Sequence, residues 1–193
     1  ADANPGTLYI GDVGWNLWEE LNVVSAPGQN YGWPIYEGME ASAYAPLITE
    51  NKDAPNPLYD GINCTLPYLR FQDLLVQDRP VHVNGHPNPC NTSVQIPNSI
   101  PKFFHARPSI DWKHGDQSRC GSFSGNTAVT FDLDDPASPV PGPRFGGYAA
   151  MAGPSSGELA LPPGYENSSF HGDYAGGFIK RFVFQAPNTP VSV

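Results

Sequence analysis

Residues 8–38 read LYIGDVGWNLWEELNVVSAPGQNYGWPIYEG, the most informative stretch in the chain. A β-rich run at 7–10 stops at a glycine, and an alternating run at 20–24 stops at a Pro-Gly pair. Between these runs, residues 11–14 form a glycine-flexed turn that can point backbone carbonyls at one place. The pattern predicts two short strands joined by a turn.

An acidic pair, Glu19 and Glu20, precedes the second run. Neighbouring residues of a strand face opposite ways, so the pattern predicts that the two carboxylates serve different surfaces. A rigid aromatic turn, Asn-Tyr-Gly-Trp-Pro, follows at 30–34. Carbonyl and carboxylate oxygens are the ligands that calcium prefers. Glycine turns and tryptophan packing would explain the same residues without any ligand, so both interpretations stay open.

Composition favours an all-β protein. The 193 residues suit one domain, and they include 20 glycines and 22 prolines but only 15% charged residues. This excludes a helical bundle, and 39% hydrophobic residues argue against disorder. Further strands are predicted at 127–131 and 177–184, the latter with Lys180 and three phenylalanines on one face, and a brief helical turn at 71–76.

The formal net charge of −9 argues against a nucleic-acid partner. Residues 1–51 carry seven acids and no Lys or Arg, which leaves room for a hard cation as well as for a solubilising surface. No run of 18 apolar residues occurs, so no transmembrane segment is predicted.

Several features favour an extracellular or periplasmic protein. The chain starts ADANPG, without Met or a signal peptide, as expected of a processed chain or an excised piece. A disulfide, most simply Cys64–Cys90, is expected in an exported protein, with Cys120 free or paired outside the chain. N-glycosylation sequons occur at Asn63, Asn91 and Asn167.

The 39–120 segment has the composition of a loop-rich insertion. It holds the proline-rich runs APNP and HPNP and, apart from one weak match near its end, carries no family motif. Before and after it, the sequence resembles the glucose/sorbosone dehydrogenase family, the soluble pyrroloquinoline-quinone (PQQ) sugar dehydrogenases. The resemblance lies in GDVGWNLWEELN at 11–22, GQNYGWP at 28–34 and YEG at 36–38, in FHGDYAGGFIKR at 170–181, and more weakly in RPSIDWKH at 107–114.

The resemblance implies a six-bladed β-propeller, a calcium ion and PQQ. The carbonyls of Gly14 and Trp15 correspond to ligands of the catalytic calcium, although relatives have proline where Trp15 stands. Glu20 and the Tyr31 carbonyl correspond to a second, structural calcium site. Glu19 corresponds to an Asp that supports the cofactor site.

The family also uses a late Lys and Arg residues against the PQQ carboxylates. The aligned Lys position falls on Ala175, so Lys180 and Arg181 are the expected cofactor-binding residues here. The family's general base His and quinone-polarising Arg would lie before residue 1. The five His residues of this chain are therefore expected to have surface or packing roles.

Blade arithmetic predicts that residues 1–193 form one partial propeller domain of roughly three blades. The missing blades would come from the rest of a longer chain or from another chain. The expected function is PQQ- and calcium-dependent oxidation of a sugar hydroxyl, with an unspecified electron acceptor. The alternative is a secreted propeller without chemistry that binds a glycan or a protein.

Overall fold

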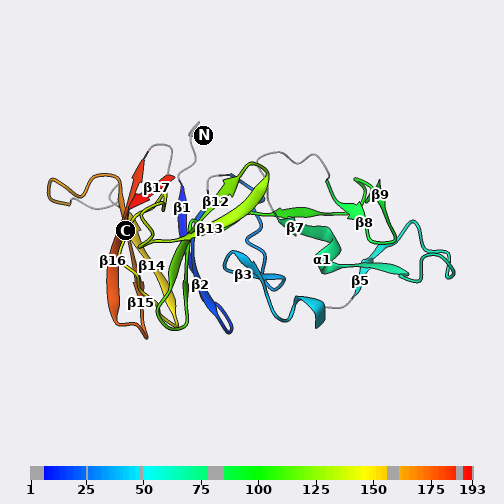
Figure 1. Ribbon diagram of the computed structural model, residues 1–193, viewed down its shortest axis with the longest axis horizontal. Coiled ribbons are helices and arrows are strands. Elements are labelled where there is room, and N and C mark those ends of the chain that lie inside the picture. Colours follow the sequence, from blue (N-terminus) through cyan, green and yellow to red (C-terminus); the bar gives the residue numbers. More distant parts are fainter. Residues whose placement is uncertain are drawn as a thin grey trace.

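The computed structural model describes residues 7–24, 26–47, 50–77, 85–155, 161–185 and 189–192. Its architecture is all-β with almost no helix, as the composition predicts. Figure 1 shows the two large sheets at one end of the molecule and the insertion at the other. No helix among the described residues is long and apolar enough to cross a membrane.

The first sheet has the strand order β1-β2-β11-β12-β13, and every neighbouring pair is antiparallel. The β1–β2 hairpin is followed by the insertion, after which β11 returns to pair with β2. The sheet therefore resumes at Ile110, before the expected end of the insertion at residue 120. Its strands are β1 (Leu8–Asp12), β2 (Trp18–Val24), β11 (Ile110–Lys113), β12 (Ser118–Ser124) and β13 (Thr127–Asp132).

The second sheet is an antiparallel meander in the order β14-β15-β16-β17. Four strands in this order are also what a propeller blade contains. Its edge strand β14 lies against β1, where a side chain at Gly11 would come within 2.8 Å of the Ala152 nitrogen. The strands are β14 (Ala150–Ser155), β15 (Ser168–Asp173), β16 (Phe178–Gln185) and β17 (Thr189–Ser192).

The main hydrophobic core lies between these two sheets. Alternate residues of β2, β11 and β12 meet the face of β16 that carries Phe182 and Phe184, which confirms the alternation predicted for that strand. The buried members are Leu21, Ile110, Trp112, Cys120, Leu133, Val140, Phe145, Ala150, Phe182 and Phe184. We call this side of the first sheet the core face and the other side the acidic face.

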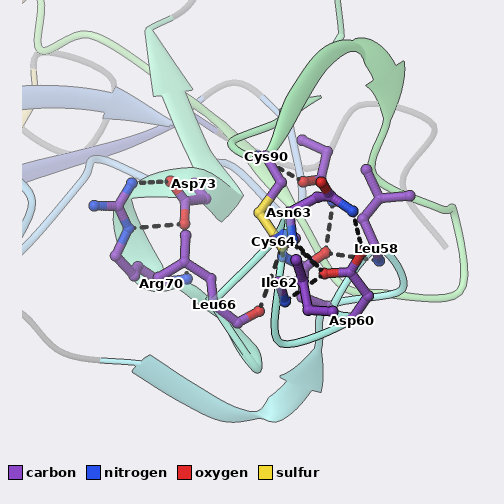
Figure 2. Close-up of a disulfide and its surroundings, with 11 residues drawn as sticks. Leu58, Asp60, Ile62, Asn63, Cys64, Leu66, Arg70, Asp73 and Cys90 are labelled. Carbon is purple, nitrogen blue, oxygen red and sulfur yellow. Dashed lines mark hydrogen bonds and ion pairs between the residues drawn. A yellow bond between two sulfur atoms is a disulfide. The ribbon is translucent and has the colours of Figure 1, made fainter.

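The insertion is built from short two-stranded sheets and two small apolar clusters. The predicted Cys64–Cys90 disulfide is confirmed and cross-links this region (Figure 2). Cys120 is a buried free thiol. The helical turn predicted at 71–76 is present but ends at Leu74. The elements are β3 (Tyr36–Glu37), β4 (Glu40–Ala41), η1 (Ala45–Leu47), β5 (Glu50–Pro55), β6 (Tyr68–Arg70), α1 (Phe71–Leu74), β7 (Leu75–Gln77), β8 (Pro87–Asn88), β9 (Asn91–Gln95) and β10 (Phe103–His105).

Candidate functional site

The β1–β2 turn is closed by a single carboxylate from β3. Glu37 is only 4% exposed. Its Oε1 atom accepts hydrogen bonds from the backbone N–H groups of Asn16 (2.7 Å), Leu17 (2.7 Å) and Trp18 (3.2 Å). A side chain at Gly14 would collide with the Trp18 carbonyl and approach Glu37 Oε1, so glycine is required there. The YEG motif thus fixes the GDVGWN turn from a different segment.

This arrangement sets the direction of the carbonyls in the turn. In a trans peptide the C=O points opposite to the N–H of the next residue. Because the N–H groups of Asn16, Leu17 and Trp18 converge on Glu37, the carbonyls of Trp15, Asn16 and Leu17 point away from it. The Leu17 carbonyl accepts the His114 N–H at 2.8 Å. The Trp15 carbonyl, one of the two expected calcium ligands of the turn, therefore lies beside a second outward carbonyl.

The acidic pair faces both sides of the sheet, as the alternation predicts. On the core face, Glu19 is fully buried; its carboxylate accepts the Ala150 N–H at 2.6 Å and lies 2.8 Å from His114 Nε2. Burial raises the pKa of Glu19, and the hydrogen bonds from Ala150 and His114 offset only part of that effect. Both oxygens of Glu19 are thus engaged inside the protein, where they join the two large sheets.

Asp173, from the predicted GDY motif, belongs to the same polar group on the core face. Its carboxylate accepts hydrogen bonds from Trp112 Nε1 (3.1 Å), Ala149 N–H (2.9 Å) and Gly176 N–H (2.6 Å). Burial opposes the ionisation of Asp173, but these hydrogen bonds outweigh it and lower its pKa. Asp173 therefore holds the β14–β15 region against the indole of the first sheet.

On the acidic face, Glu20 lies in a row of carboxylates. The strand register places Asp12 of β1 and Asp111 of β11 on either side of it. Arg119 neutralises Asp111 through contacts of 3.0 and 2.6 Å, whereas Glu20 has no cationic partner among the described residues. Burial raises the pKa of Glu20 to about 8, partly offset by hydrogen bonds from Asn22 and the Gly38 N–H, and the charges of Asp12 and Asp111 raise it further.

One unpaired acceptor oxygen lies beside the Glu20 carboxylate. Asn22 donates its amide to Glu20 at 2.9 Å, and its own Oδ1 is buried without a donor among the described residues. Tyr31 lies near enough that the charge of Glu20, after burial, contributes to raising its pKa to about 12. This proximity concerns the Tyr31 phenol, whose O–H donates to the Val23 carbonyl at 3.0 Å, so the expected pairing of Glu20 with the Tyr31 carbonyl at a second calcium site stays a prediction. The Glu20 carboxylate and Asn22 Oδ1 are oxygen atoms of the kind that suit a calcium ion.

Lys180 and Arg181 are not brought together. Lys180 is on the inner face of β16, with its Nζ 4.4 Å from the centre of the Phe145 ring, and burial lowers its pKa. Arg181 points to the opposite face, where its Nε donates to Ser168 Oγ at 2.7 Å and its guanidinium lies over Tyr165. A single ligand would meet at most one of these two cations.

The described histidines contact neighbouring groups of the protein. His105 and His171 are fully buried, and burial lowers the pKa of each to about 4. Neither ring nitrogen of His171 has a hydrogen-bond partner among the described residues. His86 is 2% exposed and contacts the Phe103 carbonyl at 2.6 Å, whereas His114 contacts Glu19. The fifth, His82, lies outside the described residues.

Sequence reasoning missed the roles of Glu37, His114 and Asn22. Glu37 and His114 lie inside motifs that were recognised, so their positions were visible, but only the folded chain shows their contacts with the turn and with Glu19. No group of three or more His, Cys, Asp or Glu side chains arranged around a metal occurs in the part of the chain that the structure describes. The candidate cation sites therefore depend mainly on backbone and amide oxygens.

Comparison with known proteins adds no relative. The chain matches no protein-family model, no curated protein and no solved structure.

Proposed function

We propose that this chain is part of a secreted or periplasmic, calcium-dependent quinoprotein dehydrogenase that oxidises a sugar hydroxyl. The observation that carries the proposal is the turn at residues 14–17, where Glu37 draws three N–H groups to one side and leaves the carbonyls facing the other. This is the segment whose sequence resembles the calcium-binding turn of the PQQ sugar dehydrogenases. The disulfide and the exposed sequon asparagines support an exported protein.

The two implied cofactors fit the described residues unequally. The Trp15 and Asn16 carbonyls provide the hard oxygen donors that calcium takes, and the Gly14 carbonyl immediately precedes them in the chain. PQQ, when bound, supplies the two-electron acceptor for the sugar, and its three carboxylates need cationic partners. Lys180 and Arg181 face opposite sides of β16, so these residues do not form such a pocket. In the proposal, the missing cations, the general base and the remaining blades come from outside residues 1–193.

A second candidate is an exported propeller that binds a sugar polymer or a protein without chemistry. The placement of Glu19 favours it, because both carboxylate oxygens are used by Ala150 and His114 and none is left for a cofactor. In this candidate the turn is a structural element, and calcium, where it binds, only stabilises the fold.

Calcium titration calorimetry on the 1–193 chain tests the turn, with Glu37→Gln as the variant. Glu50→Gln is the matched control, since Glu50 is exposed and lies in β5, within the insertion. Weaker calcium binding in Glu37→Gln alone supports the turn as a cation site. No saturable binding to the unaltered chain would overturn it.

Dye reduction by the longer protein, reconstituted with PQQ and calcium and supplied with several sugars, then separates the two candidates. Reduction that requires both cofactors supports the dehydrogenase. Calcium binding without any reduction supports the second candidate.

A further inference from the structure

Three aromatic side chains from separate segments gather on the surface beside the turn. Trp15, Trp33 and Tyr44 are 63%, 53% and 37% exposed. The rings of Trp15 and Tyr44 are stacked, with centroids 4.9 Å apart and planes 27° from parallel, and Trp33 meets Trp15 edge-on at 6.0 Å. We call these residues the aromatic platform. Large rings clustered at the surface commonly mark a binding site.

The platform continues into a groove. Trp33 lines two hollows, one of about 250 Å³ and one of about 430 Å³, and both also include Asn30 and Phe103. The smaller hollow is mostly apolar, with Pro34 and Phe71 in its lining. The larger one is open and lined by polar and backbone groups, among them Asp12, Gln29, Gly28 and Gly32. The two hollows and the platform thus form one continuous surface centred on Trp33.

The lining chemistry selects the ligand class. Among the residues that the structure describes, no Lys, Arg or His side chain lines either hollow, which disfavours phosphorylated or carboxylated ligands. The smaller hollow contains the Asn51 amide beside its aromatic rings, and the larger contains the Gln29 amide. Asn30 accepts the Gly32 N–H at 2.8 Å on its Oδ1, which fixes the amide and directs its NH₂ group as a donor. Aromatic faces with a few fixed amides recognise a molecule that has both C–H faces and hydroxyl groups.

We propose that the aromatic platform and the groove bind an uncharged oligosaccharide, with sugar rings stacked on Trp15 and Trp33 and hydroxyl groups hydrogen-bonded to Asn30 and Asn51. The inference rests on the proposed function, in that it names the ligand as a sugar chain and not a single sugar. Binding itself requires neither calcium nor quinone. A surface that extends over two hollows and a platform is longer than one sugar ring needs.

Calorimetry on the 1–193 chain in EDTA tests the proposal, with neutral glucose, mannose and xylose hexasaccharides as probes. At least one hexasaccharide should bind saturably, and the affinity of the corresponding monosaccharide should be lower by about tenfold or more. Trp15→Ala should weaken hexasaccharide binding by about tenfold, since a lost stacking contact costs ~1–1.5 kcal/mol. Tyr174→Ala is the matched control, because Tyr174 is 80% exposed in the β15–β16 turn of the second sheet and lines neither hollow.

Trp33→Phe, which retains a ring, provides a second variant in case alanine disturbs the fold. Its affinity for the hexasaccharide should lie between that of the unaltered chain and that of Trp15→Ala. Absence of binding to all three hexasaccharides, or equal losses in Trp15→Ala and Tyr174→Ala, would overturn the proposal. So would tighter binding of an acidic hexasaccharide, or capture of a protein partner that the hexasaccharides do not displace.

Calcium titration on the same samples keeps the two proposals apart. Hexasaccharide binding without calcium binding supports the sugar-binding groove and removes the calcium-dependent reaction. Calcium binding without hexasaccharide binding overturns the groove alone.

Discussion

Replacement of Glu37 by glutamine should loosen the β1–β2 turn more than any conservative change at the surface. The variant keeps an acceptor oxygen but loses the charge that three N–H groups share. A hydrogen bond to a charged group stabilises by about 1.5–3 kcal/mol against about 0.5–1.5 for a neutral one, so the three together lose about 3 kcal/mol. In a chain of this size that corresponds to a fall of about 6–12 °C in Tm.

Thermal unfolding followed by circular dichroism measures this change, with Glu50→Gln as the control. Amide hydrogen exchange locates it, because the N–H groups of Asn16, Leu17 and Trp18 should lose protection while the β15–β16 amides keep theirs. An unchanged Tm together with unchanged exchange at these three amides would show that Glu37 does not hold the turn. Glu37 would then also not direct the carbonyls of Trp15 and Asn16 outward.

Three further predictions concern pH and the disulfide. The pKa of His171 is lowered to about 4, so its neutral ring is compatible with the fold at pH values above 6.5, the ordinary pKa of His. Up to about 3 kcal/mol of stability is lost as the pH falls through 4. Urea unfolding of His171→Phe should show a flatter pH dependence between those values, and an unchanged slope would contradict this. The pKa of Glu20 is raised to about 8, so its protonated form stabilises the fold below the ordinary value of 4.5, and that stability is lost as the pH rises through 8. In EDTA, urea titration should give Glu20→Gln a free energy of unfolding up to about 5 kcal/mol higher than that of the unaltered chain at about pH 9, and nearly the same value at about pH 4.5. An equal difference at both pH values would refute the raised pKa of Glu20. The double variant Cys64→Ser and Cys90→Ser should have a free energy of unfolding about 3.5 kcal/mol lower, as expected for a loop of 26 residues, when measured by urea unfolding. An unchanged free energy of unfolding after reduction of the unaltered chain would contradict this prediction.

The local features of the fold were predictable because they depend on short periods. Alternation alone predicts that Glu19 and Glu20 face opposite sides of β2, and the register confirms it. The same period predicts the apolar face of β16, where Phe182 and Phe184 are buried. Composition predicts an all-β chain because glycine and proline disfavour helices wherever they occur.

Long-range pairing was not predictable by these means. β11 pairs with β2 only after the whole insertion has intervened, and no local pattern reports a partner so distant. Most strands of the insertion have two or three residues, too few to show a period, so the only expectations for residues 39–109 were the disulfide and one helical turn. The number of blades in the complete protein remains a prediction from the resemblance.

The acidic N-terminal segment illustrates how a local excess of charge is resolved by distant residues. Residues 1–51 contain no Lys or Arg, yet Glu19 contacts His114 and Glu40 pairs with Arg119, both from beyond the insertion. Among the described residues, the donors to the buried Glu20 carboxylate are the neutral groups of Asn22 and Gly38, whereas the buried Asp111 carboxylate pairs with Arg119. Burial raises the pKa of Glu20, as it raises the pKa values of Glu19 and Asp111, and a bound cation would lower it again.

The β1–β2 turn is tied to three other parts of the fold through separate groups. Glu37, in β3, holds the N–H groups of the turn, and the N–H of His114, directly after β11, holds the Leu17 carbonyl. Glu19, in the strand that follows the turn, accepts the Ala150 N–H from the second sheet. A cation on the Trp15 and Asn16 carbonyls would therefore act on a turn whose position already depends on both large sheets. Because binding stabilises only the folded arrangement, calcium should raise the stability of the sheet junction as well as that of the turn.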